Sequence, residues 1–292
     1  MIKVLLTHSM PSKKIPSVEE FQKIILDNYQ AHARTFPWKQ TRDPYAILVS
    51  EIMLQQTQTE RVIPKYNSWL EKFPTVHDVA KAQLAEVLAM WSGLGYNRRA
   101  KFLHEACKKL ADIIDSTGIF PTTAQELEKL PGIGHYTARA VVTYAFNNEE
   151  IFIETNIRSV FLFFFFQDRL QAPTYEPVHD NEIFPLIEKT FYKNNPRTWY
   201  YALMDYGAEL KKTVKNPNRK SKHYAKQSKF EGSIRQARGA ILRQLSNTSE
   251  SMTLTTIAHA ENIDYSRILS ASELLCAEKL IQKQGDLYSI SE

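Results

Sequence analysis

Cysteine, glycine and long apolar runs are all scarce in this sequence. Two cysteines, Cys107 and Cys276, stand in 292 residues. They are too few for a disulfide framework or for a cysteine-ligated zinc or iron–sulfur site, so we expect reduced thiols on apolar faces. Nine glycines exclude a collagen-like or low-complexity chain. The composition is that of one or two globular domains.

The sequence also lacks membrane and export signals. No run approaches the roughly 20 apolar residues of a membrane-spanning helix. The first residues, MIKVLLTHSMPSKK, have neither the order nor the length of a secretory signal. We therefore expect a cytoplasmic protein.

Acidic residues are missing from residues 211–229, which we call the basic strip. The strip carries eight Lys or Arg, whereas residues 1–210 have a net charge of −1 and residues 231–292 a net charge of −2. Such a strip can neutralise phosphates and release their counterions, as nucleic-acid-binding proteins do. On charge alone, a solvated loop that keeps the protein soluble explains it equally well.

Apolar residues at three- and four-residue spacing predict a series of helices in the first 210 residues. Three apparent capping boxes mark helix starts, and they are Ser17/Glu20, Thr57/Glu60 and Thr75/Asp78. Four X-Pro steps mark joints, and they are Phe73-Pro74, Phe120-Pro121, Ala172-Pro173 and Asn195-Pro196. The run from Phe161 to Phe166 predicts a buried helix without a functional role. No alternating strand pattern precedes residue 280.

The chain after the basic strip predicts three helices, over 232–245, 254–260 and 265–280, and then a hairpin over 281–290 around a Gly-Asp turn. This order is similar to a winged helix. From Asp264 to Leu280, the third helix and the residue before it carry two basic residues against three acidic ones, which is a poor phosphate-binding face. Packing, or contact with another protein, is the role that we expect for this winged-helix-like domain as a whole.

The strongest local motif is LPGIGHYTA at residues 130–138. Its two glycines allow a tight turn, and the helix that follows presents amide groups that can hold a phosphate. An ordinary joint between two helices would look the same. In an appropriate context, the motif would clamp a DNA backbone without reading its sequence.

This motif resembles the helix-hairpin-helix of the HhH-GPD superfamily of DNA glycosylases. Further stretches match its adenine glycosylase branch, the MutY-type enzymes, in the expected order: FPW at 36–38, SEIMLQQTQ at 50–58, WSGLGY at 91–96 and ALMDYGA at 202–208. The resemblance implies an all-α fold of two helical subdomains with a DNA-binding cleft. The implied boundaries are an N-terminal extension (1–16), a glycosylase domain (17–210) with its helix-hairpin-helix at about 123–147, a basic loop (211–230) and a winged-helix-like domain (231–292).

The resemblance also implies a catalytic pair. Base excision needs a flipped base, a proton for the departing base and stabilisation of an oxocarbenium-like sugar. Glu51 matches the general acid, although alone it could be a salt-bridged core residue. Glu154 stands where the family has Asp, and Asn156 matches the residue that orients it. The extra methylene of Glu154 moves the carboxylate by more than about one ångström, a catalytically relevant distance. A cap on a helix that begins at Asn156 is its structural alternative.

Tyr136 occupies the position where bifunctional relatives place a Schiff-base lysine. A phenol cannot form a Schiff base, so a monofunctional enzyme is expected. Tyrosine at this position also occurs in thymine glycosylases and does not choose between the two substrates.

Further matches imply contacts with DNA. The implied base pocket consists of Arg34, Trp38, Leu54 and Asp205, of which Asp205 could instead be a solvent-facing acid. The implied contacts to the opposite base are Gln56, Thr57, Leu94 and Tyr96, with Tyr96 as an inserted wedge or, alternatively, a core aromatic. The implied backbone contacts are Gly132, Gly134, His135 and Thr137, to which we add Lys215, Arg219, Lys220 and Lys222 of the basic strip.

Two family features are missing. Most relatives carry a four-cysteine iron–sulfur loop, but here Lys211 stands near the first cysteine position and no cysteine follows until Cys276. No cluster is therefore expected, and the strip would contact phosphates in place of that loop. No metal-ligand set is visible, although carbonyls of the hairpin could hold an ion. Residues 233–292 are too short for the Nudix-like domain of MutY-type enzymes, which weakens the expectation of an 8-oxoguanine preference.

We therefore predict a monofunctional DNA glycosylase of base excision repair, acting on adenine opposite guanine or 8-oxoguanine. A mismatch glycosylase for thymine, uracil or another altered base is the first alternative. A non-catalytic binder of DNA structures is the second. The expected partner is double-stranded DNA with a mismatched or damaged base, and the expected protein is a nucleoid-associated monomer without a cofactor.

Overall fold

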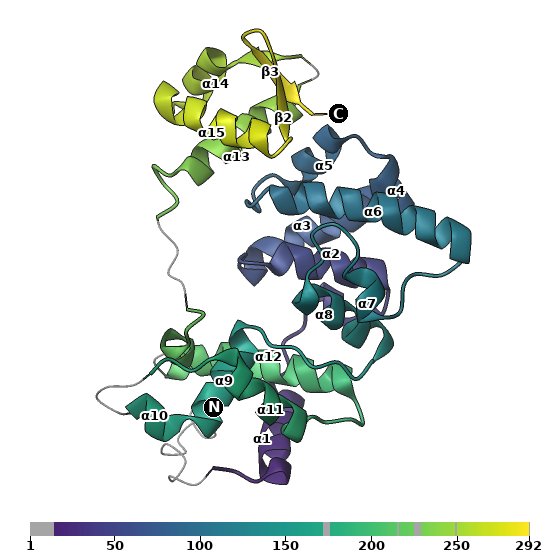
Figure 1. The fold of residues 1–292 in the computed structure, drawn as a ribbon, viewed down its shortest axis with the longest axis vertical. Helices are drawn as coiled ribbons and strands as arrows, with labels where there is room; N and C mark the ends of the chain where they lie inside the picture. The colour runs from purple at the N-terminus through teal and green to yellow at the C-terminus, as the bar shows by residue number, and fades with distance from the viewer. Residues whose placement is uncertain (1–14, 172–175, 215, 225–228, 249, 292) are drawn as a thin grey trace. The chain divides into compact units, whose positions relative to one another are not determined.

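The computed structural model describes residues 15–171, 176–214, 216–224, 229–248 and 250–291 (Figure 1). Most of the predicted extension at 1–16 and the Ala172-Pro173 joint lie outside these residues. The chain divides into two compact units. The first unit contains residues 1–36 and 142–226, and the second unit contains residues 37–141 and 227–292. Among the described residues, none of the helices combines the length and the apolar character that crossing a bilayer needs.

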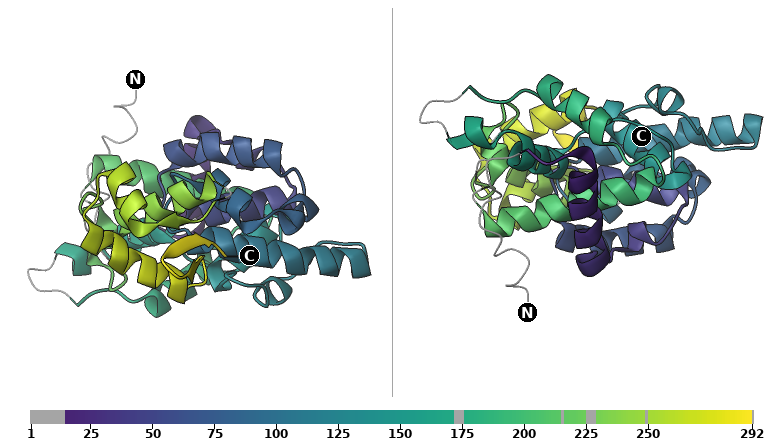
Figure 2. Two further views of the ribbon diagram at one scale, coloured as in Figure 1. Left: turned by 90° about the horizontal axis from the view of Figure 1, so that it is seen from above. Right: turned by 90° about the horizontal axis from the view of Figure 1, so that it is seen from below.

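The first unit packs its helices around aromatic side chains. Its elements are α1 (Val18–His32), the end of α8 (His135–Phe146), α9 (Thr155–Phe165), α10 (Gln167–Gln171), α11 (Asp180–Thr190), α12 (Pro196–Thr213) and the 3-10 helix η2 (Pro217–Lys220). Helix α12 packs against α9 and α1, as Figures 1 and 2 show. The Phe21 ring lies 5.4 Å from Phe161 and 5.8 Å from Trp199, centroid to centroid. The predicted burial of the phenylalanine-rich helix is confirmed, because Phe161 is fully buried.

The first part of the second unit is a helical bundle. Its elements are η1 (Pro37–Lys39), α2 (Pro44–Leu54), α3 (Thr59–Lys72), α4 (Val76–Lys81), α5 (Leu84–Trp91), α6 (Arg98–Thr117), α7 (Ala124–Leu127) and the start of α8. Trp69 and Trp91 are fully buried at its centre, with their rings 5.7 Å apart. The indole of Trp69 donates to the Tyr45 hydroxyl (3.0 Å), which donates in turn to the carbonyl of Phe73 (2.8 Å).

The second part of this unit is the C-terminal segment, made of α13 (Ile234–Ser246), β1 (Met252–Thr253), α14 (Leu254–Glu261), α15 (Tyr265–Ala277), β2 (Ile281–Gln284) and β3 (Leu287–Ile290). Its strands form an antiparallel sheet in the order β1-β3-β2. The predicted hairpin is confirmed, with Lys283 opposite Tyr288. One strand of the described chain precedes residue 280, because β1 pairs with β3. Two residues are too few to show an alternating pattern. Helix α13 packs against both α15 and α5.

The helix-start signals are mostly confirmed. Ser17 and Thr75 form complete capping boxes at α1 and α4. The predicted box at Thr57 is wrong, because α3 begins two residues later, after Gln58, without a side-chain cap. The Thr57 hydroxyl instead donates to the carbonyl of Gln55 (3.3 Å) and accepts from Arg99 (3.1 Å). The Thr57 hydroxyl, which was expected to cap the helix, therefore binds the distant Arg99 instead.

Gly207 permits a close approach between α12 and α9. A Cβ at this position would collide with the backbone carbonyl of Asn156, which cannot move away as a side chain can. Packing therefore requires the glycine of the ALMDYGA stretch.

We expect Gly207→Ala to lower the free energy of unfolding by about 2 kcal/mol, because overpacking forces backbone shifts. Urea unfolding would measure the change. Gly239→Ala is the matched control, since a Cβ on that helical glycine meets nothing within 4 Å. It should raise stability by about 0.5–1 kcal/mol. Equal effects of the two substitutions would contradict the packing role of Gly207.

Candidate active site

Glu51 and Tyr136 meet inside the second unit. Glu51 is only 4% exposed on the apolar helix α2. The Tyr136 hydroxyl, from the first turn of α8, donates to Glu51 Oε2 at 2.8 Å. A phenol therefore orients this carboxyl, and two motifs 85 residues apart in sequence come together.

The predicted hairpin connects α7 to α8. Gly132 has φ +70°, and a Cβ there would collide with the side chain of Phe102, whereas a Cβ on Gly134 would meet nothing within 4 Å. Both glycines and His135 are exposed. The side chain of Thr137 is only 2% exposed and accepts a hydrogen bond from Gln55 Nε2 at 3.2 Å. Its hydroxyl thus faces the protein, so a phosphate contact at Thr137 would have to use its backbone.

Glu154 and Asn156 meet inside the first unit. One oxygen of Glu154 accepts from the amides of Asn156 (2.6 Å) and Ile157 (2.8 Å). The structural alternative is therefore confirmed, with α9 beginning at Thr155, one residue before the expected start. Asn156 Nδ2 lies 3.2 Å from the other oxygen of Glu154 and orients it.

Lys211 extends this arrangement. Its Nζ donates to Asn156 Oδ1 at 2.6 Å, so Lys211, Asn156 and Glu154 form one hydrogen-bonded chain. Burial raises the pKa of Glu154, while the Ile157 amide and the charge of Lys211 act in the opposite direction. Burial lowers the pKa of Lys211, and the charge of Glu154 opposes that shift. Each charge therefore favours the other.

Asp205 and Arg34 form a second pair in the first unit. Asp205 is 4% exposed, so the solvent-facing alternative is wrong. Its two oxygens accept from the backbone amide and Nε of Arg34, both at 2.9 Å. In the second unit, Trp38 is buried edge-on against Tyr66, with ring centroids 5.5 Å apart, and Leu54 ends α2.

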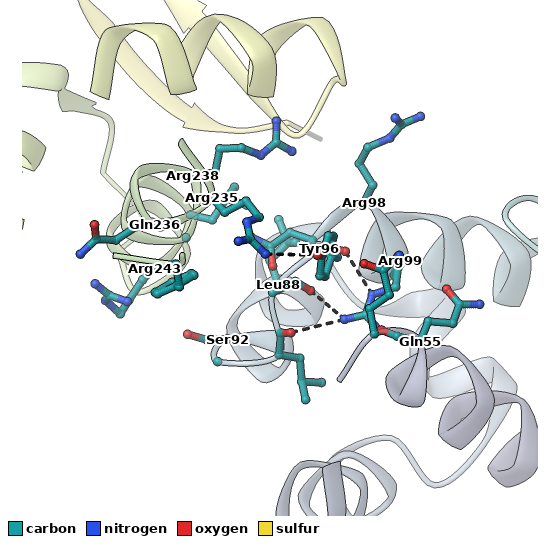
Figure 3. A pocket seen from close by; sticks show the side chains of 18 of the residues that line it. Gln55, Leu88, Ser92, Tyr96, Arg98, Arg99, Arg235, Gln236, Arg238 and Arg243 are labelled. Atoms are coloured by element: carbon teal, nitrogen blue, oxygen red, sulfur yellow. Dashed lines mark hydrogen bonds between the residues drawn. The ribbon is translucent and has the colours of Figure 1, made fainter. Parts of the chain in front are cut away.

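Arg99 ties together the two loops that hold the predicted opposite-base residues. Its guanidinium donates to the carbonyls of Ile52 (2.7 Å), Met53 (3.0 Å), Gln55 (2.7 Å) and Gly95 (2.9 Å), and to Thr57 Oγ1 (3.1 Å). Figure 3 shows it between Gln55 and Tyr96. Burial lowers the pKa of Arg99 to about 10. Arg99 was not predicted from the sequence as a functional residue, because nothing in the spacing of the neighbouring residues distinguishes it from Arg98.

Both loops hold strained residues. Gln56 has φ 55° and Tyr96 has φ 49°, left-handed values that cost a residue with a side chain about 1–2 kcal/mol. Tyr96 is 38% exposed, so the alternative of a core aromatic is wrong. Leu94, by contrast, is buried. Strain of this kind persists where surrounding contacts overdetermine the backbone, and the bonds of Arg99 provide such contacts.

Residues 211–214 and 216–224 of the basic strip belong to the first unit, whereas Lys229 belongs to the second. Val178 donates its amide to the carbonyl of Lys220 and accepts from the amide of Lys222, both at 3.2 Å. Arg219 and Lys222 are exposed, and Lys215 lies outside the described residues.

The residues of the basic strip do not fit an iron–sulfur cluster. They include no cysteine that could supply a thiolate, and Lys211 binds Asn156. Across the described ranges, no group of three or more His, Cys, Asp or Glu side chains could hold a metal ion. The two cysteines are free thiols, and burial raises the pKa of Cys107 to about 12.

Comparison with known sequences places this geometry in context. The model of the HhH-GPD superfamily of base excision DNA repair proteins matches residues 49–189. An adenine DNA glycosylase of Rattus norvegicus is 34% identical over 217 residues, which cover 70% of this chain and 40% of the rat protein. An adenine DNA glycosylase of Mycolicibacterium smegmatis is 43% identical over 137 residues, covering 47% of this chain and 46% of that protein. The chain thus spans less than half the length of these relatives.

Solved structures share the fold. A thermostable thymine-DNA glycosylase is similar with a TM-score of 0.57 and 29% identity, over 65% of this chain and 86% of that one. A trapped endonuclease III–DNA covalent intermediate gives a TM-score of 0.53 at 22% identity, over 66% and 87% of the two chains. The predicted helical fold is confirmed, with a small C-terminal sheet in addition.

Replacing Arg99 by Lys should lower the free energy of unfolding by about 2–3 kcal/mol, because an ammonium cannot satisfy the same set of buried carbonyls. Urea unfolding would test this. Arg98→Lys is the control, since Arg98 is exposed and its replacement should change stability by less than about 0.5 kcal/mol. If Arg99→Lys were as mild as this control, Arg99 would not hold the two loops.

Proposed function

Because the chain belongs to the HhH-GPD superfamily of base excision DNA repair proteins, we propose that it is a monofunctional DNA glycosylase that hydrolyses the N-glycosidic bond of adenine opposite guanine or 8-oxoguanine. The observation that carries this proposal is the buried Glu51 carboxyl held by the Tyr136 hydroxyl. The names of the curated relatives support adenine as the base.

Glu51 is the proton donor in this proposal. A purine leaves the sugar more easily once it is protonated, and a positioned carboxylic acid supplies that proton. Tyr136 fixes the direction of the carboxyl through its 2.8 Å hydrogen bond. Because a phenol forms no Schiff base with the sugar, water takes the place of a lysine nucleophile and the DNA strand stays intact.

Glu154 stabilises the sugar as the base departs. An ionised carboxylate can balance the positive charge of an oxocarbenium-like sugar. Two amides hold one oxygen of Glu154, and Asn156 holds the other. Lys211 favours the ionised form through its charge. Capping a helix and balancing this charge are compatible tasks, because both require a carboxylate at the N-terminus of α9.

The partner in this proposal is double-stranded DNA with a mismatched base. The exposed hairpin glycines and His135 would contact the backbone, together with Arg219, Lys220 and Lys222 of the basic strip. Tyr96 would enter the base stack, which its exposure allows. The C-terminal segment, with three helices and a hairpin, would be a winged-helix-like domain.

Single-turnover excision from duplexes that contain A, T, U or hypoxanthine opposite G, or A opposite 8-oxoguanine, would test the proposal. We expect release of A, detected as strand breaks that appear only after alkali treatment. Glu51→Gln should lower this rate by about 10²- to 10⁴-fold, the usual contribution of a general acid. The control is Glu60→Gln, an exposed acid on α3.

Release of another base would keep the reaction and change the substrate. Similarity to the thymine-DNA glycosylase structure makes T opposite G the second base to examine. Tight binding without excision of any base would overturn the proposed enzyme.

The pH dependence of single-turnover excision should depend on Lys211. Glu154 must be ionised to act, and burial raises its pKa above the ordinary 4.5, so the rate should fall as pH drops through that raised pKa. Lys211→Met removes a charge that favours the carboxylate, so the acid limb should move to higher pH. Lys212→Met, an exposed neighbour paired with Glu209, should leave the limb in place. An unchanged limb in Lys211→Met would disprove the coupling.

A further inference from the structure

A cavity of about 1020 Å³ lies within the second unit, between residues 92–99, which form a loop and the start of α6, and helix α13 of the C-terminal segment. Figure 3 shows Gln55, Tyr96, Arg98 and Arg99 on one side, and Arg235, Arg238 and Arg243 of α13 on the other. Its volume is several times that of a single phosphate group, so the cavity suits a chain-like ligand better than a small ion.

The lining of this cavity is strongly positive. Six arginines line it against two glutamates. Two of the arginines are neutralised, because Arg238 pairs with Glu278 (3.1 Å) and Arg243 with Glu261 (3.2 Å).

Three further arginines of the lining are not neutralised by a carboxylate. Arg61 donates to the carbonyl of Gly93, Arg98 lies 5.3 Å from the Phe102 ring centroid, and Arg99 binds carbonyls. In the described parts of the chain, no carboxylate forms an ion pair with Arg61, Arg98 or Arg99. An excess positive charge therefore remains for an anionic ligand.

Arg235 connects the C-terminal segment to the loop. Its Nη1 donates to the Tyr96 hydroxyl at 3.2 Å, and its guanidinium lies 6.0 Å from the centre of that ring. The two residues are 139 positions apart in the sequence. Arginine of this kind can bind a phosphate and hold an aromatic ring at the same time.

We propose that this cavity binds the phosphate backbone of the DNA strand opposite the extruded base, and that α13 is the part of the C-terminal segment that contacts DNA. The inference rests on the proposed function, which places Gln56 and Tyr96 at the opposite base. The charge and the volume of the cavity suit consecutive phosphates. Residues 265–280, the third helix of the segment, are a poor phosphate surface. Arg235, Arg238 and Arg243 instead come from its first helix, α13.

Gly239 offers a direct test. It lines the cavity from α13, and a Cβ there meets nothing within 4 Å. Gly239→Glu and Gly239→Gln add side chains of nearly equal size that differ in charge, and both residues favour helix. Urea unfolding of the two variants would show that each remains folded.

Affinity for a short duplex with one A·G mismatch would be measured by fluorescence anisotropy at several salt concentrations. We expect Gly239→Glu to bind about tenfold more weakly than Gly239→Gln at low salt. The salt slope of log affinity should also be smaller by about one, as when one phosphate contact is lost. Equal affinities and equal slopes for the two variants would overturn the proposal.

Methylphosphonate linkages, which are neutral, test the choice of strand. Placed opposite the mismatched adenine, they should abolish the difference between the two variants, whereas the same linkages in the adenine strand should leave it. The reverse pattern would overturn the assignment to the opposite strand. These binding measurements do not depend on turnover. A protein that fails to excise any base would contradict the proposed function and still report whether the cavity binds DNA.

Discussion

One half-buried guanidinium, that of Arg99, supports much of the second unit. The last carbonyls of a helix have no partner within the helix, and a planar fork of five donors can satisfy several of them at once. Arg99 does this for the end of α2 and simultaneously binds the loop that contains Gly95. The Trp91 indole reaches the same carbonyl of Gly95 at 3.1 Å, so the loop is also attached to the core. Glu51 lies one turn before the end of α2 and therefore on a helix whose terminus is fixed.

In the first unit, the N-terminus of α9 is held by a hydrogen-bonded chain of Glu154, Asn156 and Lys211. Glu154 is longer than the aspartate that the family resemblance implies at this position, yet its carboxylate accepts the first amides of α9. Lys211 stands near the position where the resemblance implies the first cysteine of a metal-binding loop, and its ammonium reaches Asn156. Two departures from the family pattern, Glu154 and Lys211, thus belong to one hydrogen-bonded arrangement. The segment that follows is held by backbone bonds to Val178.

Features that depend on near neighbours in the sequence were predictable. The caps at Ser17 and Thr75, the buried phenylalanine helix and the C-terminal hairpin all arise from residues within a few positions of one another. The motif positions Glu51, Tyr136, Glu154 and Asn156 were found through resemblance. The long-range contacts of Arg99, Lys211 and Arg235 were not predictable, because the partners in these contacts lie 42 to 139 positions away. Thr57 shows the same limit, since a distant arginine decides how its hydroxyl is used.

Both units are discontinuous in the chain, and this has a consequence for folding. Helix α1 packs against α12, and α5 packs against α13, so each unit closes through contacts of high sequence separation, which slow folding. A chain synthesised from its N-terminus releases the whole first unit once residue 226 has emerged, whereas the second unit still lacks residues 227–292. Its surface on α5 stays uncovered until α13 follows. The unit that contains Glu154 can therefore complete its contacts on the ribosome before the unit that contains Glu51.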